Sequence, residues 1–238
     1  MMQQLRPLYP NRRIATVQEV YAPHILNIFS DASTRNTAET NAAAYAAVAV
    51  CMDTMIDSVV RIHTDSDAAV EELRGLKSAL AMACRHRYEF PIINIFSDSL
   101  VSVQNVRDRP SYWVFDHNLH TYYTDAKSPV KNMEILAEAL ALLQDLRRTT
   151  EVNIYHVKGH VTTDSNNREA YRQLKIGTST FSRYNHVNRQ VETNLIRYLA
   201  AYNGVADILS RSLLYRTNVF ADEYKDAVQF ELKQDVFF

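Results

Sequence analysis

The five residues Asn-Ile-Phe-Ser-Asp occur twice, at 27–31 and at 94–98. Each copy ends an apolar run typical of a buried strand, and each run closes with a carboxylate, Asp31 or Asp98. Two such strands lying side by side and parallel would bring these carboxylates together. Hard cations bind oxygen ligands at the carboxyl ends of strands, so the pattern indicates a divalent-metal site. The alternative is that each aspartate is a helix N-cap.

The elements that must position these carboxylates follow from the apolar pattern. A strand from residue 25 to 31, a polar turn over 33–41 and apolar runs at 45–52 and 55–63 indicate an antiparallel meander. Residues 65–67 offer N-cap chemistry for a helix that extends to Cys84. Its apolar positions keep helical spacing at Leu73, Leu76, Leu80 and Ala83.

The second half alternates strands with helices. Residues 92–96 form a strand, 100–106 a short helix, and 112–123 an aromatic stretch of mixed polarity; Pro129 opens a helix, 152–157 form a strand, and the last helix begins near Asn203. The resulting β-β-β-α-β-α-α-β-α order predicts an α/β fold with a mixed sheet flanked by helices. We expect an irregular N-terminal arm over 1–24, one domain over 25–212 with an insertion at about 161–202, and a C-terminal extension over 213–238.

Composition excludes several classes of protein. The chain has 238 residues, 47% of them hydrophobic, enough for a core, and its net charge of -1 gives no overall basic signature for nucleic acid. Only four glycines occur, which excludes a phosphate-binding Gly-rich loop. Cys51 and Cys84 are expected to be reduced, and no apolar run has the length of a membrane span, so we expect a cytoplasmic location.

Six segments spread over residues 25–212 together resemble ribonuclease H of the type 1 family. They are FSDAS (29–33), EEL (71–73), FSDS (96–99), SPVKN (128–132), HVKGH (156–160) and NGVADILSR (203–211). The resemblance implies a five-stranded RNase H-like sheet and an endonuclease that cuts the RNA strand of an RNA–DNA hybrid. It also implies metal ligands at Asp31, Glu72, Asp98 and Asp207.

The resemblance assigns further roles. Glu72 is preferred to Glu71 because it directly precedes Leu73, and Glu71 is expected to be solvated. Four converging carboxylates repel one another, and two Mg²⁺ ions, with Mn²⁺ as an alternative, would relieve that repulsion. His160 would shuttle protons or assist product release, since imidazole titrates near neutral pH; its alternative is a hydrogen-bonded loop residue. The implied nucleic-acid contacts are Lys131, Asn132, Trp113 and Asn203.

The sequence departs from the family in several places. The insertion alternates basic residues with Tyr171, Tyr184, Tyr198 and Tyr202, which either bind nucleic acid or pack on the core. Asp67, Ala68 and Ala69 stand where the family has amides and hydroxyls that contact 2′-hydroxyls. The segment 107–127 occupies the place of the family's basic handle, but it carries less positive charge than the family leads us to expect. A related nuclease acting on DNA or structured RNA, and a non-catalytic binding module, are the alternatives. We expect a monomer, or an oligomer formed through the insertion.

Overall fold

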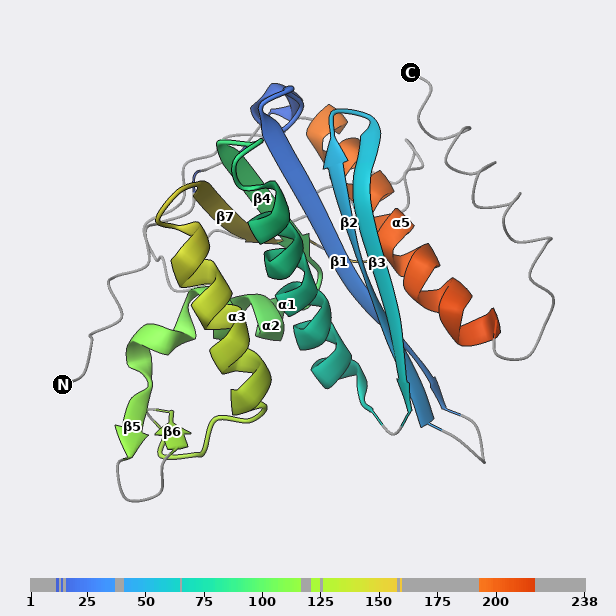
Figure 1. Cartoon of the computed structure of the whole chain (residues 1–238). Coiled ribbons are helices and arrows are strands. Elements are labelled where there is room, and N and C mark those ends of the chain that lie inside the picture. Colours follow the sequence, from blue (N-terminus) through green and yellow to red (C-terminus); the bar gives the residue numbers. More distant parts are fainter. Residues whose placement is uncertain are drawn as a thin grey trace.

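The computed structural model of the chain describes residues 12, 14, 16–36, 41–64, 66–116, 121–124, 126–157, 159 and 193–216. Its main sheet has five strands in the order β3-β2-β1-β4-β7 (Figure 1). β1 is antiparallel to β2 and β2 to β3, whereas β1, β4 and β7 are mutually parallel. The predicted mixed five-stranded sheet is confirmed. The strands are β1 (Ile25–Asn36), β2 (Asn41–Cys51), β3 (Thr54–Thr64), β4 (Ile92–Ser97) and β7 (Glu151–His156).

Helices cover both faces of this sheet. α1 (Ala68–His86) and α3 (Met133–Leu146) lie over one face, and α5 (Thr193–Arg216) lies over the other (Figure 1). The short helix α2 (Leu100–Arg107) follows β4 and leads through the 3-10 turn η2 (Arg109–Tyr112) into a small hairpin. That hairpin, β5 (Val114–Asp116) and β6 (Thr121–Tyr123), projects from the lower end of the molecule in Figure 1. Another 3-10 turn, η1 (Val17–Glu19), precedes β1.

α1 forms where its sequence predicts it. The Asp67 carboxylate accepts a hydrogen bond of 2.8 Å from the Val70 backbone amide, which satisfies one of the unpaired donors of the first turn. Leu73, Leu76 and Leu80 recur at helical spacing and are buried against the sheet. The helix therefore has one fixed apolar face, which places the residues of its first turn next to β1 and β3.

The repeated segments 27–31 and 94–98 lie beside each other in register. Asn27 pairs with Asn94 across β1 and β4, and Asn94 pairs with Asn153 on β7. The buried side chains form a ladder: the Asn94 amide donates to Asn27 at 3.1 Å, and the Asn153 amide donates to Asn94 at 3.3 Å. Each buried amide thus gains a partner from the neighbouring strand, as burial of polar groups requires.

Aromatic rings repeat the same register two residues further along. Phe29 stacks on Phe96 with ring centroids 4.9 Å apart, and Phe96 stacks on Tyr155 at 5.2 Å. From α5, Tyr198 and Tyr202 pack against Phe29 and are only 6% and 5% exposed. These two tyrosines therefore belong to the core, so the interpretation in which they contact nucleic acid is wrong. The other insertion residues before 193 lie outside the described ranges.

Two strand boundaries differ from the prediction. β1 does not end at Asp31 but continues to Asn36, paired with an alanine-rich β2 that begins at Asn41. The described residues of the predicted turn, 33–36 and 41, are therefore strand, and 37–40 lie outside the described ranges. The parallel pairing of β1 with β4 ends at Ser30 and Ser97. Beyond that point β4 no longer flanks β1, so polar residues are compatible with strand structure there.

The starts of two helices also differ from the prediction. α5 begins at Thr193 rather than near Asn203, because Leu195 and Leu199 extend its apolar face upstream. α3 begins at Met133 rather than at Pro129, since Pro129 forms a β-bridge with Tyr123.

The described part of the N-terminal arm is packed on the sheet. Ile14 and Val20 are 7% and 0% exposed and lie in the core cluster under α5. The Arg12 carbonyl accepts a hydrogen bond of 2.6 Å from the Tyr155 hydroxyl. This part of the arm therefore contributes to the core.

As predicted, Cys51 and Cys84 are free thiols. Among the described residues, no helix combines the length and apolarity needed to cross a membrane.

Candidate active site

Asp31 and Asp98 meet where the parallel pairing of β1 and β4 stops. The last paired residues are Ser30 and Ser97, so the two aspartates follow at equivalent positions of adjacent strands. The Asp31 carboxylate accepts a hydrogen bond of 2.7 Å from the Ala32 amide, and the two carboxyl groups share a side-chain hydrogen bond. The predicted juxtaposition is confirmed, and Asp31 is not a helix N-cap because it lies within β1.

Glu72 brings a third carboxylate to the pair from α1. One carboxylate oxygen from each of Asp31, Glu72 and Asp98 lies within 4.8 Å of the others. Gly75, one turn further along α1, lies beside β1: a Cβ built there would make an ordinary contact of 3.7 Å with the Asp31 carbonyl oxygen. Among the described residues, buried Glu72 Oε2 has no hydrogen-bond partner. A buried oxygen of that kind, in a group of three carboxylates, fits a cation ligand.

The electrostatics of this acidic triad oppose ionisation. Burial raises the pKa of Glu72 to about 9, and the charges of Asp98 and Asp31 add to the effect. Burial likewise raises the pKa of Asp31, with further contributions from the charges of Asp98 and Asp207. A bound cation would reverse the balance by favouring the charged forms. The chemistry of the donor set therefore fits a hard divalent metal ion.

We expect the metal-free protein to lose stability as pH rises. Asp31 and Glu72 bind protons more tightly when folded than when unfolded, so their contribution is complete below their unfolded pKa values of 3.8 and 4.5. That contribution is lost as pH rises toward 9, by at least about 2 kcal/mol in total. Urea unfolding in EDTA at pH 5.5, 7 and 8.5 measures it. A slope that Glu72→Gln leaves unchanged would contradict this origin.

Asp207 lies beside the triad on α5. Its charge raises the pKa of Asp31, and its carboxylate accepts a hydrogen bond of 2.7 Å from Arg211 Nε. Ser210 and Ser33 hydroxyl groups, 2.8 Å apart, join this part of α5 to β1. Thus the structure groups three of the four predicted ligands and places the fourth next to them, facing an arginine.

The last residue of β7 and the segment that follows it support Asp98, which the sequence did not predict. His156 Nε2 donates to the Asp98 carbonyl oxygen at 3.1 Å, and burial lowers the pKa of His156, which favours the neutral ring. Gly159 lies against the Asp98 side chain so closely that an added Cβ would be 2.1 Å from Oδ2. The HVKGH motif contained the signal, but only His160, which lies outside the described residues, received a role.

The expectation that Glu71 is solvated is also wrong. Glu71 is fully buried rather than solvated, with ion pairs to His63 and Arg74. Glu72, which follows it, carries the triad carboxylate. The two neighbours are separated because consecutive helical residues point about 100° apart.

The predicted nucleic-acid contacts differ in accessibility. Lys131 and Asn132 are exposed at the N-terminus of α3, where Asn132 adopts a left-handed conformation with φ 55°. Trp113 is half-buried and packs against the core. Asn203 is only 4% exposed, which does not favour direct contact with nucleic acid.

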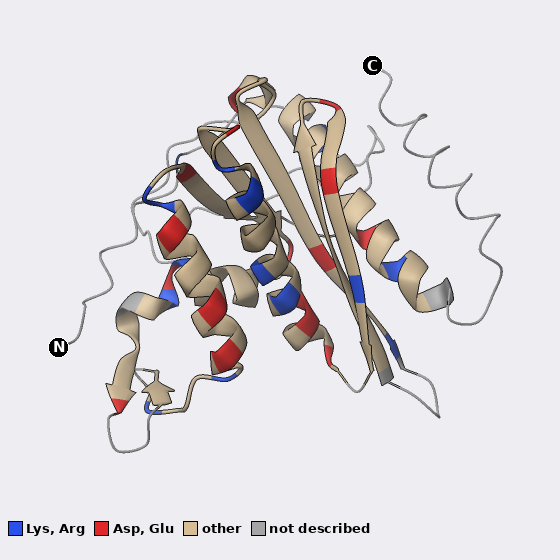
Figure 2. Cartoon of the chain, in the orientation of Figure 1, with Lys and Arg blue, Asp and Glu red and all other residues tan. Residues whose placement is uncertain are grey.

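The arginines at the start of the segment 107–127, whose positive charge is predicted to be weak, are engaged by neighbouring side chains and backbone. Arg107 pairs with Asp108 and donates to the Ile154 carbonyl oxygen, and Arg109 donates to Gln104 and Asn105. On the neighbouring α3, acidic side chains recur along the helix (Figure 2) at Glu134, Glu138 and Asp145.

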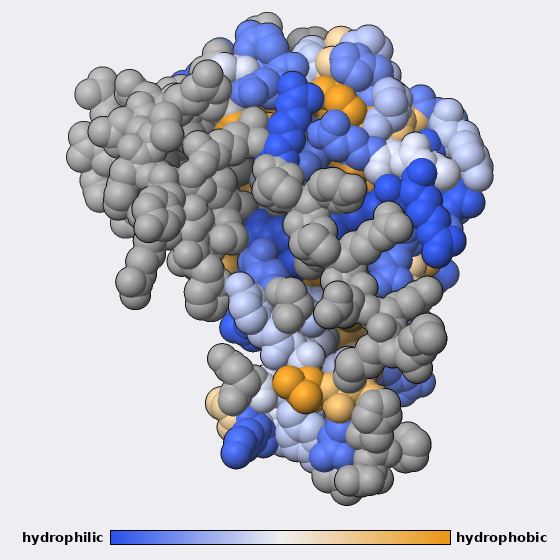
Figure 3. Space-filling model, turned by 90° about the vertical axis from the view of Figure 1, so that its left-hand side faces the viewer, coloured by the Kyte–Doolittle hydropathy of each residue, from blue (hydrophilic) through white to orange (hydrophobic). Residues whose placement is uncertain are grey.

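The same region exposes apolar surface. Apolar atoms are visible on the lower projection of the molecule in Figure 3, which contains the hairpin of β5 and β6. Exposed side chains there include Tyr112 at 60% and Val114 at 62%. A partner of this surface would therefore meet apolar and aromatic groups more than free arginines.

The sheet order and its flanking helices define an RNase H-like α/β protein. The RNase H family model matches residues 23–177, well over half of the sequence. The chain belongs to the RNase H family, and its class of enzyme is ribonuclease H.

Several solved structures are similar to this chain at low sequence identity. Prototype foamy virus protease-reverse transcriptase is 14% identical, with a TM-score of 0.52 over 81% of this chain and 21% of that one. The N-terminal RNase H domain of a Mycobacterium tuberculosis protein is 19% identical, with a TM-score of 0.39 over 55% of this chain and 84% of that one. RNase H1 from Halobacterium salinarum is 14% identical, with a TM-score of 0.38 over 56% of this chain and 86% of that one. No curated protein sequence matches significantly.

Proposed function

We propose that this protein is a metal-dependent endonuclease that hydrolyses the RNA strand of RNA–DNA hybrids. The observation that carries the proposal is the acidic triad of Asp31, Glu72 and Asp98, assembled from β1, α1 and β4 in a member of the RNase H family. A non-catalytic binder would gain nothing from buried carboxylates facing a phosphate backbone. The triad therefore favours catalysis over simple binding.

The residues have distinct roles in this proposal. Asp31, Glu72 and Asp98, with Asp207 beside them, would hold two Mg²⁺ or Mn²⁺ ions. Bound cations would supply a nucleophilic water at neutral pH and charge stabilisation for the leaving 3′ oxygen. Since the pKa values of Glu72 and Asp31 are raised, these carboxyl groups would give up protons when they bind a cation.

Side chains around the triad would bind and orient the nucleic acid. Lys131 and Asn132 are exposed beside a helix N-terminus, where an anion such as the DNA-strand phosphate is stabilised. Trp113 would offer its partly exposed ring to the same strand. His160 would move a proton or assist product release. We do not include Asn203, because its side chain is buried.

One feature favours the second candidate, a nuclease that also accepts DNA or structured RNA. Asp67, Ala68 and Ala69 are exposed at the start of α1, and the Asp67 carboxylate is engaged as the N-cap. Recognition of RNA depends on contacts to 2′-hydroxyls, which alanine side chains do not provide. Selectivity for hybrids would then depend on other contacts.

Cleavage of matched substrates tests the proposal. We expect a hybrid to be cut in its RNA strand when Mg²⁺ is present, RNA and DNA duplexes of the same sequence to be cut far more slowly, and EDTA to stop the reaction. Equal cutting of hybrid and DNA duplex would favour the second candidate. Failure to cut any substrate in Mg²⁺ or Mn²⁺ would refute nuclease activity.

A further inference from the structure

Glu71 is held in a closed network at the start of α1. Its side chain is 0% exposed. Oε2 lies 2.8 Å from His63 Nδ1 on β3, and Oε1 accepts hydrogen bonds from Ser66 at 2.6 Å and from Arg74. Arg74 also donates to the Ser66 hydroxyl at 3.2 Å. Both oxygens of this buried carboxylate therefore have partners, which come from β3, from the segment before α1 and from the next turn of α1.

His63 is itself fixed on the sheet. Its ring stacks on Tyr45 of β2 with centroids 6.0 Å apart, and the Tyr45 hydroxyl lies 3.4 Å from Ser78 Oγ on α1. The network thus ties the first turns of α1 to two strands. An anchored carboxylate on one side of a helix determines how far that helix is rotated about its axis.

That rotation decides where Glu72 points. Consecutive helical residues are about 100° apart, so with Glu71 directed at His63 the next side chain is turned toward β1. Gly75 shows that the helix packs closely on the sheet here: a Cβ built there would lie at ordinary contact distances, 3.4 Å from Tyr45 Cβ and 3.7 Å from the Asp31 carbonyl oxygen. This rotation places the Glu72 carboxylate beside Asp31 and Asp98.

We propose that Glu71 is a positioning residue for the metal site, which sets the rotation of α1 so that Glu72 reaches Asp31 and Asp98. The inference rests on the proposed function, because it concerns the same cation site. It differs from a general stabilising role in a measurable way. A positioning residue affects cation affinity more than it affects the stability of the helix.

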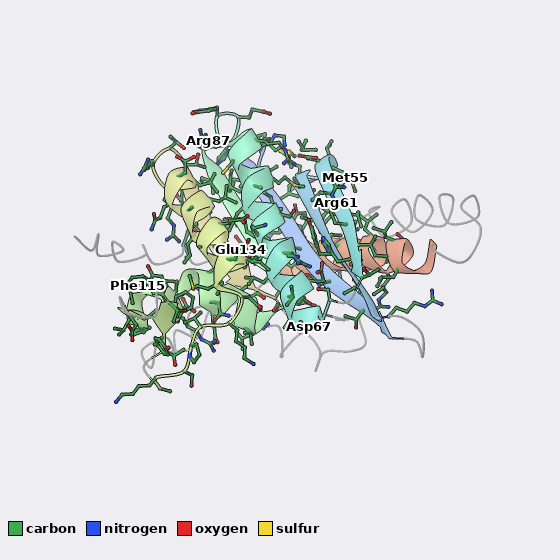
Figure 4. The ribbon with its side chains drawn as sticks, turned by 60° about the horizontal axis from the view of Figure 1, so that its bottom comes forward. Met55, Arg61, Asp67, Arg87, Phe115 and Glu134 are labelled. Carbon is green, nitrogen blue, oxygen red and sulfur yellow. The ribbon has the colours of Figure 1, made fainter. Side chains whose placement is uncertain are left out.

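A second link between the same two elements provides the matched control. Asp57 on β3 accepts a hydrogen bond of 2.6 Å from Arg85 and lies 3.3 Å from His86 Nε2, at the C-terminal end of α1. Figure 4 shows the separation: Asp67 marks the end of α1 that carries Glu71, whereas Arg87 marks the other end, toward which Met55 of β3 lies. Asp57→Asn therefore loosens α1 from β3 away from the triad.

The experiment compares Glu71→Gln and Asp57→Asn in the full chain. Mn²⁺ binding without substrate is measured by calorimetry, and unfolding is measured in EDTA. We expect Glu71→Gln to weaken Mn²⁺ binding by about tenfold or more, the range for groups that orient metal ligands, and Asp57→Asn to change it less than about twofold. We also expect Glu71→Gln to lower kcat on the hybrid at low Mg²⁺, with recovery at high Mg²⁺ and unchanged KM for the hybrid.

Each outcome has a defined meaning. Wild-type Mn²⁺ affinity in Glu71→Gln, or equal losses in both variants, would overturn the positioning role while leaving the proposed function intact. A wild-type protein that binds no Mn²⁺ would refute both. If Glu71→Gln does not fold, His63→Ala removes one of the three partners and leaves Ser66 and Arg74. It is then expected to weaken Mn²⁺ binding by about threefold, and unchanged binding would count against the proposal.

Discussion

Asp98→Asn is expected to lower cleavage of the RNA–DNA hybrid by roughly 1,000-fold or more in Mg²⁺, because several kcal/mol of charge stabilisation depend on its carboxylate. The fold should survive, since an amide has nearly the same shape. In EDTA the variant should unfold at the same or a higher urea concentration than the wild type. The substitution removes a charge that raises the pKa of both Glu72 and Asp31.

The control for this prediction is Asp145→Asn. Asp145 is half exposed and pairs with Arg87 on the surface of the α1 and α3 layer, and such solvated pairs contribute little to stability. Its cleavage rate should equal that of the wild type. Initial rates on a labelled hybrid, together with urea unfolding curves, measure both variants. An Asp98→Asn protein that turns over normally in Mg²⁺ would remove Asp98 from the metal ligands.

Gly159→Ala is expected to reduce cleavage by about 100-fold, the cost of displacing a reacting group by about 1 Å. The added methyl group would lie 2.1 Å from Asp98 Oδ2, so either the carboxylate or the loop must shift. Part of the loss should be recovered at high Mg²⁺, since the ligand is displaced rather than removed. The measurement is the dependence of cleavage rate on Mg²⁺ concentration.

Gly204→Ala is the matched substitution. Gly204 lies within α5, and a Cβ built there would come within 4 Å of no described residue outside the helix's own backbone and its two chain neighbours. Alanine should therefore leave cleavage unchanged and stabilise the protein by up to about 1 kcal/mol through helix propensity. Equal activity of the two alanine variants would show that the loop does not hold Asp98 in place.

The sheet and the central carboxylate pair could be predicted because both depend on local patterns. The duplicated segments 27–31 and 94–98 indicated two equivalent strands, and the structure pairs them in register. The spacing of Leu73, Leu76 and Leu80 likewise indicated the buried face of α1. Such patterns arise from alternation and helical periodicity, which one stretch of sequence contains in full.

The errors arose where tertiary contacts decide the outcome. Glu71 and Glu72 are chemically identical neighbours, and only His63 and Arg74 determine which one is buried in an ion-pair network. The start of α5 was missed although Leu195 and Leu199 already have helical spacing, because the burial of Tyr198 depends on Phe29 from a distant strand. The contact of Gly159 with Asp98 likewise joins residues far apart in the sequence.

The amide ladder of Asn27, Asn94 and Asn153 has a consequence for folding specificity. A slip of one residue between parallel strands would send these side chains to opposite faces and leave buried amides without partners. Apolar residues alone tolerate such misalignment better, because one aliphatic contact can replace another. The asparagines thus fix the register of the parallel strands. The closeness of Asp31 to Asp98 therefore depends on hydrogen bonds between residues that lie four positions earlier in the sequence.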